Sequence, residues 1–299
     1  MTDAALVLEG GGMRGIFTGG VLDILMEKGM SFAYVVGVSA GPCNAIDVKS
    51  RQIGRTRDCI AVDDRSLRYV HMDPLHILKG NVFDMEMLCH TYPFSAFPLD
   101  FETYFSSDTE CEMVVTNCLT GRAEYLHEDR DPYRLMNICA ASCSVPLINR
   151  EVIVDGIPCL DGGVGDSVPV ARAARKGWRK QIVVLTQAKG YREKDSHRLD
   201  ALIRWKYRKY PAFADALIRR NVTYNSVLDR LDRWEAEGHI FVIRPEEPVV
   251  GRTEQDPEKL RAFWRHSCRV MERRYEELQA YLNGPELPAG PEDTGGGTC

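Results

Sequence analysis

The chain has 299 residues, of which 44% are hydrophobic and 27% charged, with a formal net charge of -5 and a pI of about 5.9. Such a composition is typical of a globular protein that is long enough to bury a full core, as one large domain or two small ones. The acidic balance excludes a global field that would attract nucleic acid, so we expect no nucleic-acid partner.

The first residues do not have the features of a targeting or membrane-spanning segment. Met1-Thr2-Asp3 carries no basic stretch, and the apolar run behind it is interrupted by Glu9 and glycines, so we expect a cytoplasmic protein. The ten cysteines are dispersed along the chain, which favours reduced, packed thiols over disulfides. No cysteine or histidine pair joins a second pair at the spacing of a zinc site, so no metal or diffusible cofactor is expected.

The first half of the chain alternates strand and helix patterns. Strands are predicted at residues 4–8 and 34–38, and each is followed by a predicted helix, at residues 16–29 and 41–49. Residues 51–110 follow no single pattern and include an aromatic and proline-rich stretch from Tyr92 to Pro98. We expect a lid or cap region there.

The second half continues the alternation. Strands are predicted at residues 112–117, 122–126, 152–154, 157–160, 181–187 and 240–243, and helices at 131–142, 167–177, 196–237 with a break at Pro211, and 256–282. The pattern predicts a three-layer α/β/α sandwich around a mostly parallel central sheet. We expect a catalytic domain over residues 4–190, a helical extension over 191–282 that packs on the same domain and adds one late strand at 239–243, and a disordered tail over 283–299.

A serine stands at the corner between the second predicted strand and its helix, in Gly37-Val38-Ser39-Ala40-Gly41. A serine nucleophile must protrude from the backbone, and glycines two residues before and after it keep Cβ atoms out of a strained corner. Gly37 and Gly41 meet that demand. The alternative is a serine that only caps the following helix.

A glycine loop, Gly10-Gly11-Gly12, follows the first predicted strand and continues through Met13-Arg14-Gly15. Glycines accept the backbone angles that turn successive N–H groups into one pocket, so this loop is a candidate oxyanion hole. Arg14 is expected either to hold the loop or an anionic part of the substrate, or to form a surface salt bridge. The same glycines fit a dinucleotide-binding pattern, but the acidic residue expected about twenty positions later is absent from Phe32 to Gly37.

Asp161 is the candidate base for Ser39, because it follows a predicted strand and precedes Gly162 and Gly163. None of the histidines stands in a turn after a late strand, where an ordinary Ser-His-Asp esterase would need one. A carboxylate can act directly when burial and a hydrogen bond to the hydroxyl raise its basicity. We expect Asp155 to serve a hairpin turn and Asp166 to begin the next helix, and the Ser-His-Asp alternative stays open.

Taken in order, the three motifs resemble those of the patatin-like phospholipases, lipid acyl hydrolases that carry Gly-Gly-Gly-x-[RK]-Gly, Gly-x-Ser-x-Gly and Asp-Gly-[AG]. The stretch Ala141 to Pro146 is also similar to that family, and residues 206–211 resemble its bacterial branch. The resemblance implies hydrolysis of lipid carboxylic esters, with Ser39 as nucleophile, Asp161 as base and then acid, and residues 10–15 as the oxyanion hole. A catalytically silent, lipid-binding relative is the alternative.

Two aromatic stretches are candidates for an apolar trough that would hold an acyl chain, residues 92–105 and the group Trp205, Tyr207 and Tyr210. The basic residues interleaved with that group are expected to meet anionic head groups at a membrane surface. They are Arg204, Lys206, Arg208 and Lys209. The alternative is an ordinary helix with a packed aromatic face and a solvated basic face.

Overall fold

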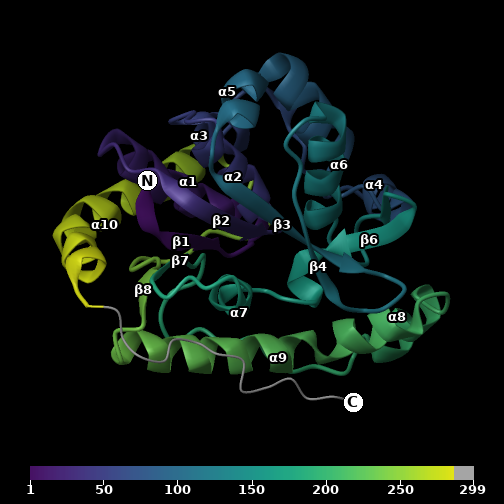
Figure 1. Ribbon diagram of the computed structural model, residues 1–299. Coiled ribbons are helices and arrows are strands. Elements are labelled where there is room, and N and C mark those ends of the chain that lie inside the picture. Colours follow the sequence, from purple (N-terminus) through teal and green to yellow (C-terminus); the bar gives the residue numbers. More distant parts are fainter. Residues whose placement is uncertain (286–299) are drawn as a thin grey trace.

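A computed structural model of the protein describes residues 1–285 and shows a mixed α/β fold built on an open sheet of eight strands (Figure 1). The strands follow the order β5-β6-β3-β2-β1-β7-β8, with β4 paired to β3. Their bounds are β1 Thr2–Leu8, β2 Phe32–Val38, β3 Glu110–Asn117, β4 Ala123–Leu126, β5 Val152–Val154, β6 Ile157–Asp161, β7 Gln181–Val184 and β8 Ile240–Ile243.

The sheet is parallel in its main part and antiparallel at one edge. Strands β3, β2, β1, β7 and β8 run parallel to one another, as predicted. Strand β6 runs antiparallel to β3, and β5 and β4 are also antiparallel to their neighbours. The predicted strand over 181–187 ends earlier, at Val184. The antiparallel edge matters for the site, because β6 ends on Asp161.

Helices cover both faces of the sheet, because the two sets of alternate residues along each buried strand are apolar. On one face, Leu6 and Leu8 of β1 pack with α1 (Gly15–Glu27) and α10 (Pro257–Asn283). On the other face, Ala5 and Val7 pack with α7 (Val170–Arg175) and α9 (Pro211–Ala236). Figure 1 shows α9 along one side of the sheet and α10 beside α1 on the other. The predicted three layers are therefore present.

The segment expected to form a lid is mostly helical. It contains α3 (Arg55–Ile60), α4 (Pro74–Lys79), the π-helix η3 (Met87–Ala96) and α5 (Phe101–Ser106), and it packs near α2 (Ala40–Lys49) and α6 (Pro132–Cys143). Asp73 and Asp100 cap α4 and α5 by accepting backbone N–H groups. The long helical region breaks as predicted, since α8 (Asp200–Lys206) ends before Pro211 begins α9.

Two further observations bear on the sequence predictions. Within residues 1–285, no helix combines the length and the apolar character needed to cross a membrane. Asn283 ends α10, so the predicted tail begins inside a helix, and its residues from 286 onward lie outside the described residues.

Candidate active site

Ser39 occupies a strained corner between β2 and α2. Its φ of 57° and ψ of -115° are unfavourable for a residue that has a Cβ. The flanking glycines leave space for that corner: a Cβ on Gly37 would lie 2.4 Å from the carbonyl carbon of Gly41, and one on Gly41 would lie 2.6 Å from the carbonyl oxygen of Leu8. The backbone therefore presents the Ser39 side chain away from the sheet, as in a nucleophile elbow.

The end of α6 holds this corner in place. The Ser39 N–H donates to the hydroxyl of Ser142 at 3.0 Å, and that hydroxyl donates to the carbonyl of Val114. The thiol of Cys143 donates to the carbonyl of Ser39 at 2.9 Å. Because all of these groups are buried, the contacts satisfy polar atoms that would otherwise be costly. The stretch 141–146 was noted only as a family resemblance, so this contribution was missed.

Strand β3 brings Ser39 and Asp161 together. Val38 pairs with Val114 on one side of β3, and Asp161 pairs with the next residue, Val115, on the other side. The Ser39 hydroxyl donates to Oδ2 of Asp161 at 2.7 Å, a normal hydrogen-bond distance. The two side chains predicted as nucleophile and base thus form a direct hydrogen bond.

Asp161 is almost completely buried, with 8% of its surface exposed. Burial raises the pKa of its carboxyl, and hydrogen bonds from Ser39 and from the Gly163 N–H act against that rise. The two glycines that follow are sterically constrained, since a Cβ on Gly162 would lie 2.1 Å from the carbonyl oxygen of Val114. The result is a carboxylate with raised basicity, fixed 2.7 Å from a hydroxyl.

The glycine loop passes directly beside Ser39. A Cβ on Gly10 would lie 2.5 Å from the Ser39 Cβ, and Gly12 has a φ of 57° that favours glycine. Throughout the described chain, no protein acceptor is bonded to the N–H groups of Gly10, Gly11 or Gly12. The Met13 N–H is not available in the same way, because it donates to the carbonyl of Arg252 at 3.1 Å.

The rest of the loop motif supports this position. The Arg14 side chain is buried, and its Nε donates to the carbonyl of Gly11 at 3.4 Å, so it folds back on the loop. Burial and the nearby Arg252 lower the pKa of Arg14. Gly15 begins α1 where a Cβ would lie 2.8 Å from the Cβ of Ala40. Of the expectations for Arg14, the structure therefore agrees with the one in which it holds the loop.

Residues from α9 and from the loop before α10 also reach this site. Tyr224 of α9 donates to the buried carboxylate of Glu9, which also accepts the Thr186 N–H at 2.6 Å. Arg220 donates from Nε to the carbonyl of Gly163 at 2.9 Å, and the positive charges of Arg220 and Arg252 lower the pKa of Asp161. Tyr224, Arg220 and Arg252 were not predicted, because no local motif connects them to the glycine loop or to Asp161.

The other candidate groups lie apart from the dyad. None of the seven histidines, all of which fall within residues 1–285, is hydrogen-bonded to Ser39 or Asp161. His266 is buried, and its Nε2 accepts the Glu246 N–H. Asp155 sits in the β5–β6 turn, as expected, and bonds to Arg134. Asp166 does not begin α7; it accepts the Tyr125 hydroxyl, and Pro169 precedes the helix.

A largely apolar pocket adjoins Ser39. Its volume is about 820 Å³, with its open mouth included. Gly12, Ser39 and Ala40 lie among its lining residues, and Phe83, Met85, Leu88, Tyr92, Leu99, Met136 and Val145 contribute apolar side chains. Residues 92–105 thus supply part of an apolar trough. Trp205, Tyr207 and Tyr210 do not line it, and Tyr207 instead packs on Phe213 with ring centres 4.9 Å apart.

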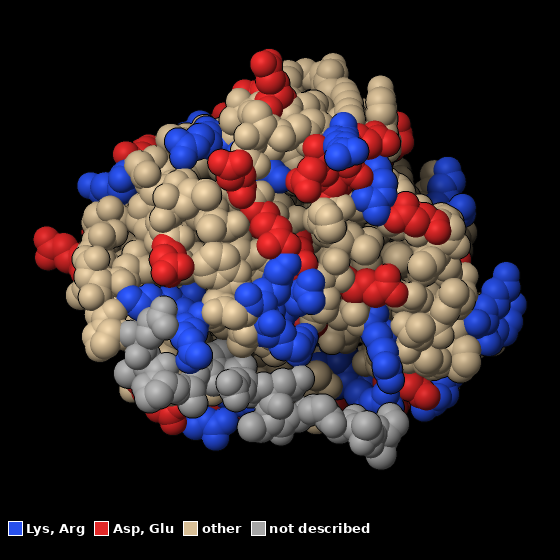
Figure 2. Space-filling model, viewed as in Figure 1, with Lys and Arg blue, Asp and Glu red and all other residues tan. Residues whose placement is uncertain are grey.

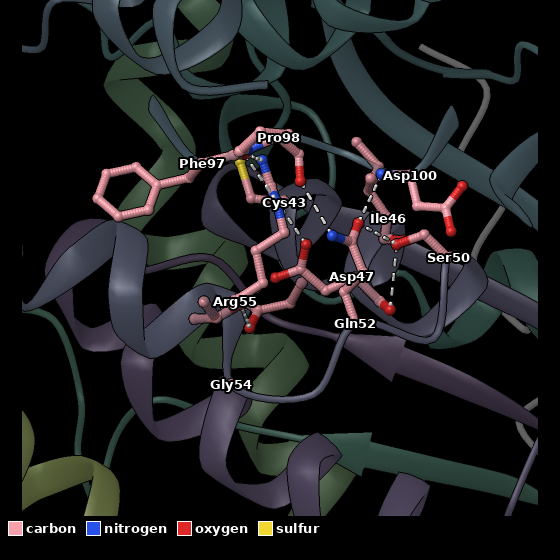
Figure 3. Close-up of polar contacts among 12 residues, drawn as sticks. Cys43, Ile46, Asp47, Ser50, Gln52, Gly54, Arg55, Phe97, Pro98 and Asp100 are labelled. Carbon is pink, nitrogen blue, oxygen red and sulfur yellow. Dashed lines mark hydrogen bonds and ion pairs between the residues drawn. The ribbon is translucent and has the colours of Figure 1, made fainter. Parts of the chain in front are cut away.

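A buried ion pair fastens one wall of this pocket (Figure 3). Arg55 of α3 bonds to Asp47 of α2 at 2.8 Å and also donates to the carbonyl of Phe97, just after η3. Nearby, the Gln52 side chain donates to the carbonyl of Pro98 and accepts the Asp100 N–H. Figure 3 shows these side chains reaching from the turn between α2 and α3 toward the 97–100 segment. Side-chain tethers, rather than a sheet, hold this wall.

Two sequence models of protein families match this chain. The sequence model of the patatin-like phospholipases matches residues 6–174, which include the glycine loop, Ser39 and Asp161. This chain belongs to the patatin-like phospholipase family. A second sequence model, described as a domain of unknown function, DUF6363, matches residues 210–283.

Two individual proteins are also similar. An uncharacterized protein, YjjU of Escherichia coli (strain K12), is 34% identical over 192 residues, which cover 61% of this chain and 51% of that protein. The chain therefore spans about half the length of this curated relative. The crystal structure of VipD from Legionella pneumophila aligns with a TM-score of 0.43 at 15% identity, over 90% of this chain and 67% of that one.

Proposed function

We propose that this protein is a serine acyl hydrolase that cleaves carboxylic esters of lipids through Ser39 and Asp161. The observation that carries the proposal is the 2.7 Å hydrogen bond between the Ser39 hydroxyl and a buried carboxylate. Ser39 lies beside a glycine loop with unbonded N–H groups, and it lines an apolar pocket. A nucleophile, a base, an oxyanion site and room for an acyl chain are the parts that ester hydrolysis requires.

In the proposed mechanism, Asp161 takes the Ser39 proton while Oγ attacks the ester carbonyl. The N–H groups of Gly10, Gly11 and Gly12 stabilise the negative oxygen, and one such donor contributes about 3 to 4 kcal/mol in a well-studied protease. The protonated Asp161 then gives its proton to the leaving alcohol. Water hydrolyses the acyl-enzyme by the same steps, with Asp161 again acting first as base and then as acid.

Three alternative functions receive less support. A Ser-His-Asp esterase needs an imidazole between serine and carboxylate, whereas here the serine bonds to the carboxylate directly. A dinucleotide-binding protein needs an open glycine turn for the pyrophosphate, but Gly10 packs against the Ser39 Cβ. A catalytically silent relative would be expected to lose the dyad, yet both side chains and their hydrogen bond are present.

The experiment is lipid hydrolysis by the wild-type protein and by Ser39→Ala and Asp161→Asn, with phospholipid and glyceride mixtures followed by mass spectrometry. We expect release of fatty acid by the wild type and a loss of at least about 10⁴-fold in either variant. Ser267→Ala and Asp166→Asn are matched controls, because each removes a hydrogen-bonded side chain that does not contact Ser39 or Asp161. Wild-type turnover in either dyad variant, with the controls intact, would refute the mechanism.

A further inference from the structure

Helix α4 exposes apolar side chains to solvent. None of its six residues is buried, and the exposed fractions are 55% for Leu75, 44% for Ile77 and 86% for Leu78, with 51% for Met72 just before it. A helix this apolar normally packs against the core, since burying a large aliphatic side chain is favourable. A cluster of exposed apolar residues of this kind points to a contact outside the chain.

Helix α8 adds a second set of exposed apolar side chains. Its inner face holds Ile203, and the buried Tyr207 follows at its end, whereas Leu202 and Trp205 point outward with exposed fractions of 46% and 66%. Arg208 lies over the Trp205 ring at 5.7 Å. Of the aromatic residues predicted here, Trp205 is thus available at the surface.

The two helices border the same loop. The Arg150 Nε donates to the carbonyl of Lys79 at the end of α4, and the Lys206 Nζ donates to the carbonyl of Leu147. Leu147 and Arg150 are only three residues apart. Figure 1 shows α4 and α8 on the same side of the molecule, beyond β6. We define residues 71–80, 147–151 and 197–210 together as the apolar-basic face.

The charge of this face is opposite to that of the whole chain. It contains seven Lys and Arg residues and three Asp and Glu residues, a surplus of four positive charges on a protein with a net charge of -5. The basic residues are Lys79, Arg150, Arg198, Arg204, Lys206, Arg208 and Lys209. Figure 2 shows Lys and Arg side chains, together with Asp and Glu, among neutral ones along the edge where α4 and α8 lie. Such a mixture is complementary to an interface that is anionic outside and apolar inside.

The face also lies next to the pocket. Val70 and Phe83 form a bridge at the base of the excursion that carries α4, and the Val82 N–H donates to the carbonyl of Ile148. Phe83 and Val145 both line the pocket. The excursion that carries α4 therefore returns at a residue, Phe83, that lines the cavity beside Ser39.

We propose that the apolar-basic face binds the surface of a bilayer that contains anionic phospholipids. Leu75, Leu78 and Trp205 would enter the interfacial region, while the surrounding Lys and Arg side chains contact the head groups. This binding requires no chemistry at Ser39. It would bring the pocket close to a source of lipid esters.

The test uses the full chain with Ser39→Ala, which keeps the vesicles intact, in cosedimentation with large unilamellar vesicles. Vesicles made of equal parts phosphatidylcholine and phosphatidylglycerol should bind the protein at 50 mM NaCl. Binding should be much weaker at 500 mM NaCl, and also to vesicles of phosphatidylcholine alone. Adding Leu78→Glu and Trp205→Glu should weaken partitioning by at least about tenfold. Changing Lys79, Arg198 and Lys209 to Gln should weaken binding to anionic vesicles by about 100-fold, since each charge contributes roughly fivefold.

Matched controls separate this effect from general surface changes. Val222→Glu alters an apolar residue of α9 that is 56% exposed, and Gln at Lys189, Lys259 and Arg269 removes three exposed charges elsewhere. These variants should bind vesicles like the parent. With Ser39 restored, the face variants should hydrolyse a soluble p-nitrophenyl ester at the wild-type rate. This assay measures catalysis without vesicles, so it distinguishes a failure of the proposed catalytic function from a failure of membrane binding.

Three outcomes would overturn the proposal. The parent protein could fail to bind anionic vesicles at low salt, or the face variants could bind as well as the parent. The third outcome is that the parent protein does not bind vesicles but forms a dimer in sedimentation velocity, and that Leu78→Glu dissociates this dimer. That result would assign the face to a second copy of the chain.

Discussion

The corner around Ser39 and the segment from residue 51 to residue 106 border the same pocket, but different interactions hold them. At the corner, close backbone approaches at Gly10, Gly37 and Gly41 leave no room for a Cβ, and strand register fixes the partners. In the 51–106 segment, side chains such as Arg55 and Gln52 tie short helices to α2.

This difference separates the effects of substitution. A change at the corner moves the reacting groups relative to one another, so it should reduce catalysis sharply whatever the substrate. A change in the 51–106 segment should alter stability or the preference for acyl chains, and it should leave the chemistry itself largely intact. The following substitutions test this comparison, from the largest expected effect to the smallest.

Gly10→Ala should have the largest effect. Its Cβ would lie 2.5 Å from the Ser39 Cβ, so either the glycine loop or the nucleophile must move. We expect kcat/KM for a p-nitrophenyl ester to fall by about 1,000-fold, because misplaced donors no longer stabilise the oxyanion. Gly251→Ala is the matched control, since the nearest atom to its Cβ would be 3.9 Å away. Equal activity of the two variants would show that the close approach does not matter.

Arg55→Met should mainly affect stability. It would leave the 95%-buried Asp47 side chain without its ion-pair partner and would release the carbonyl of Phe97. We expect the free energy of unfolding in urea to fall by about 3 to 5 kcal/mol. Combining it with Asp47→Leu, which removes the unpaired charge, should recover part of that loss. If Arg55→Met alone were as stable as the wild type, the Arg55–Asp47 pair would not have this stabilising role.

Arg220→Gln should change the pH dependence. The positive charge of Arg220 lowers the pKa of Asp161, so its removal should raise that pKa. Because Asp161 acts as a base only when ionised, the acidic limb of the kcat/KM profile should move to higher pH, with activity nearly unchanged at high pH. The neighbouring Arg219→Gln is the control. An acidic limb that stays in place, or moves to lower pH, would exclude this electrostatic role.

Leu99→Trp should have the smallest and most selective effect. Leu99 is 5% exposed and lines the pocket, so a larger side chain there fills space that an acyl chain would need. We expect about tenfold lower kcat/KM for a long-chain ester and less than about twofold for a butyrate ester. Leu119→Trp, at an exposed turn outside the pocket, should change neither. Uniform loss on both esters would indicate a general packing defect instead.

The sequence predicted the regions where the backbone makes unusual demands. Strand, glycine loop, helix and elbow follow in the predicted order, because apolar runs and glycine spacing are local properties of the chain. The same holds for the hairpin that carries Asp161. The mostly parallel sheet is confirmed, but the antiparallel pairing of β6 with β3 was not predicted, since the pairing of strands that are distant in sequence leaves no local signal.

The contributions that the sequence did not predict join distant segments. Tyr224 reaches Glu9 across 215 residues, and Arg220 reaches Gly163 across 57. Neither has a spacing rule, because each depends on how α9 packs on the sheet. Of the two interpretations of the aromatic group around Trp205, Tyr207 follows the one with a packed aromatic face, because it contacts Phe213 of α9 and does not line the pocket.

The most direct test of the central claim is to trap the acyl-enzyme. Rapid acid quenching of a reaction with a p-nitrophenyl ester, followed by intact and tandem mass spectrometry, should find one acyl group on Ser39 and none in Asp161→Asn. An acyl group on Cys43 or Cys143, which also line the pocket, or full acylation of Ser39 without the Asp161 carboxylate, would contradict the account.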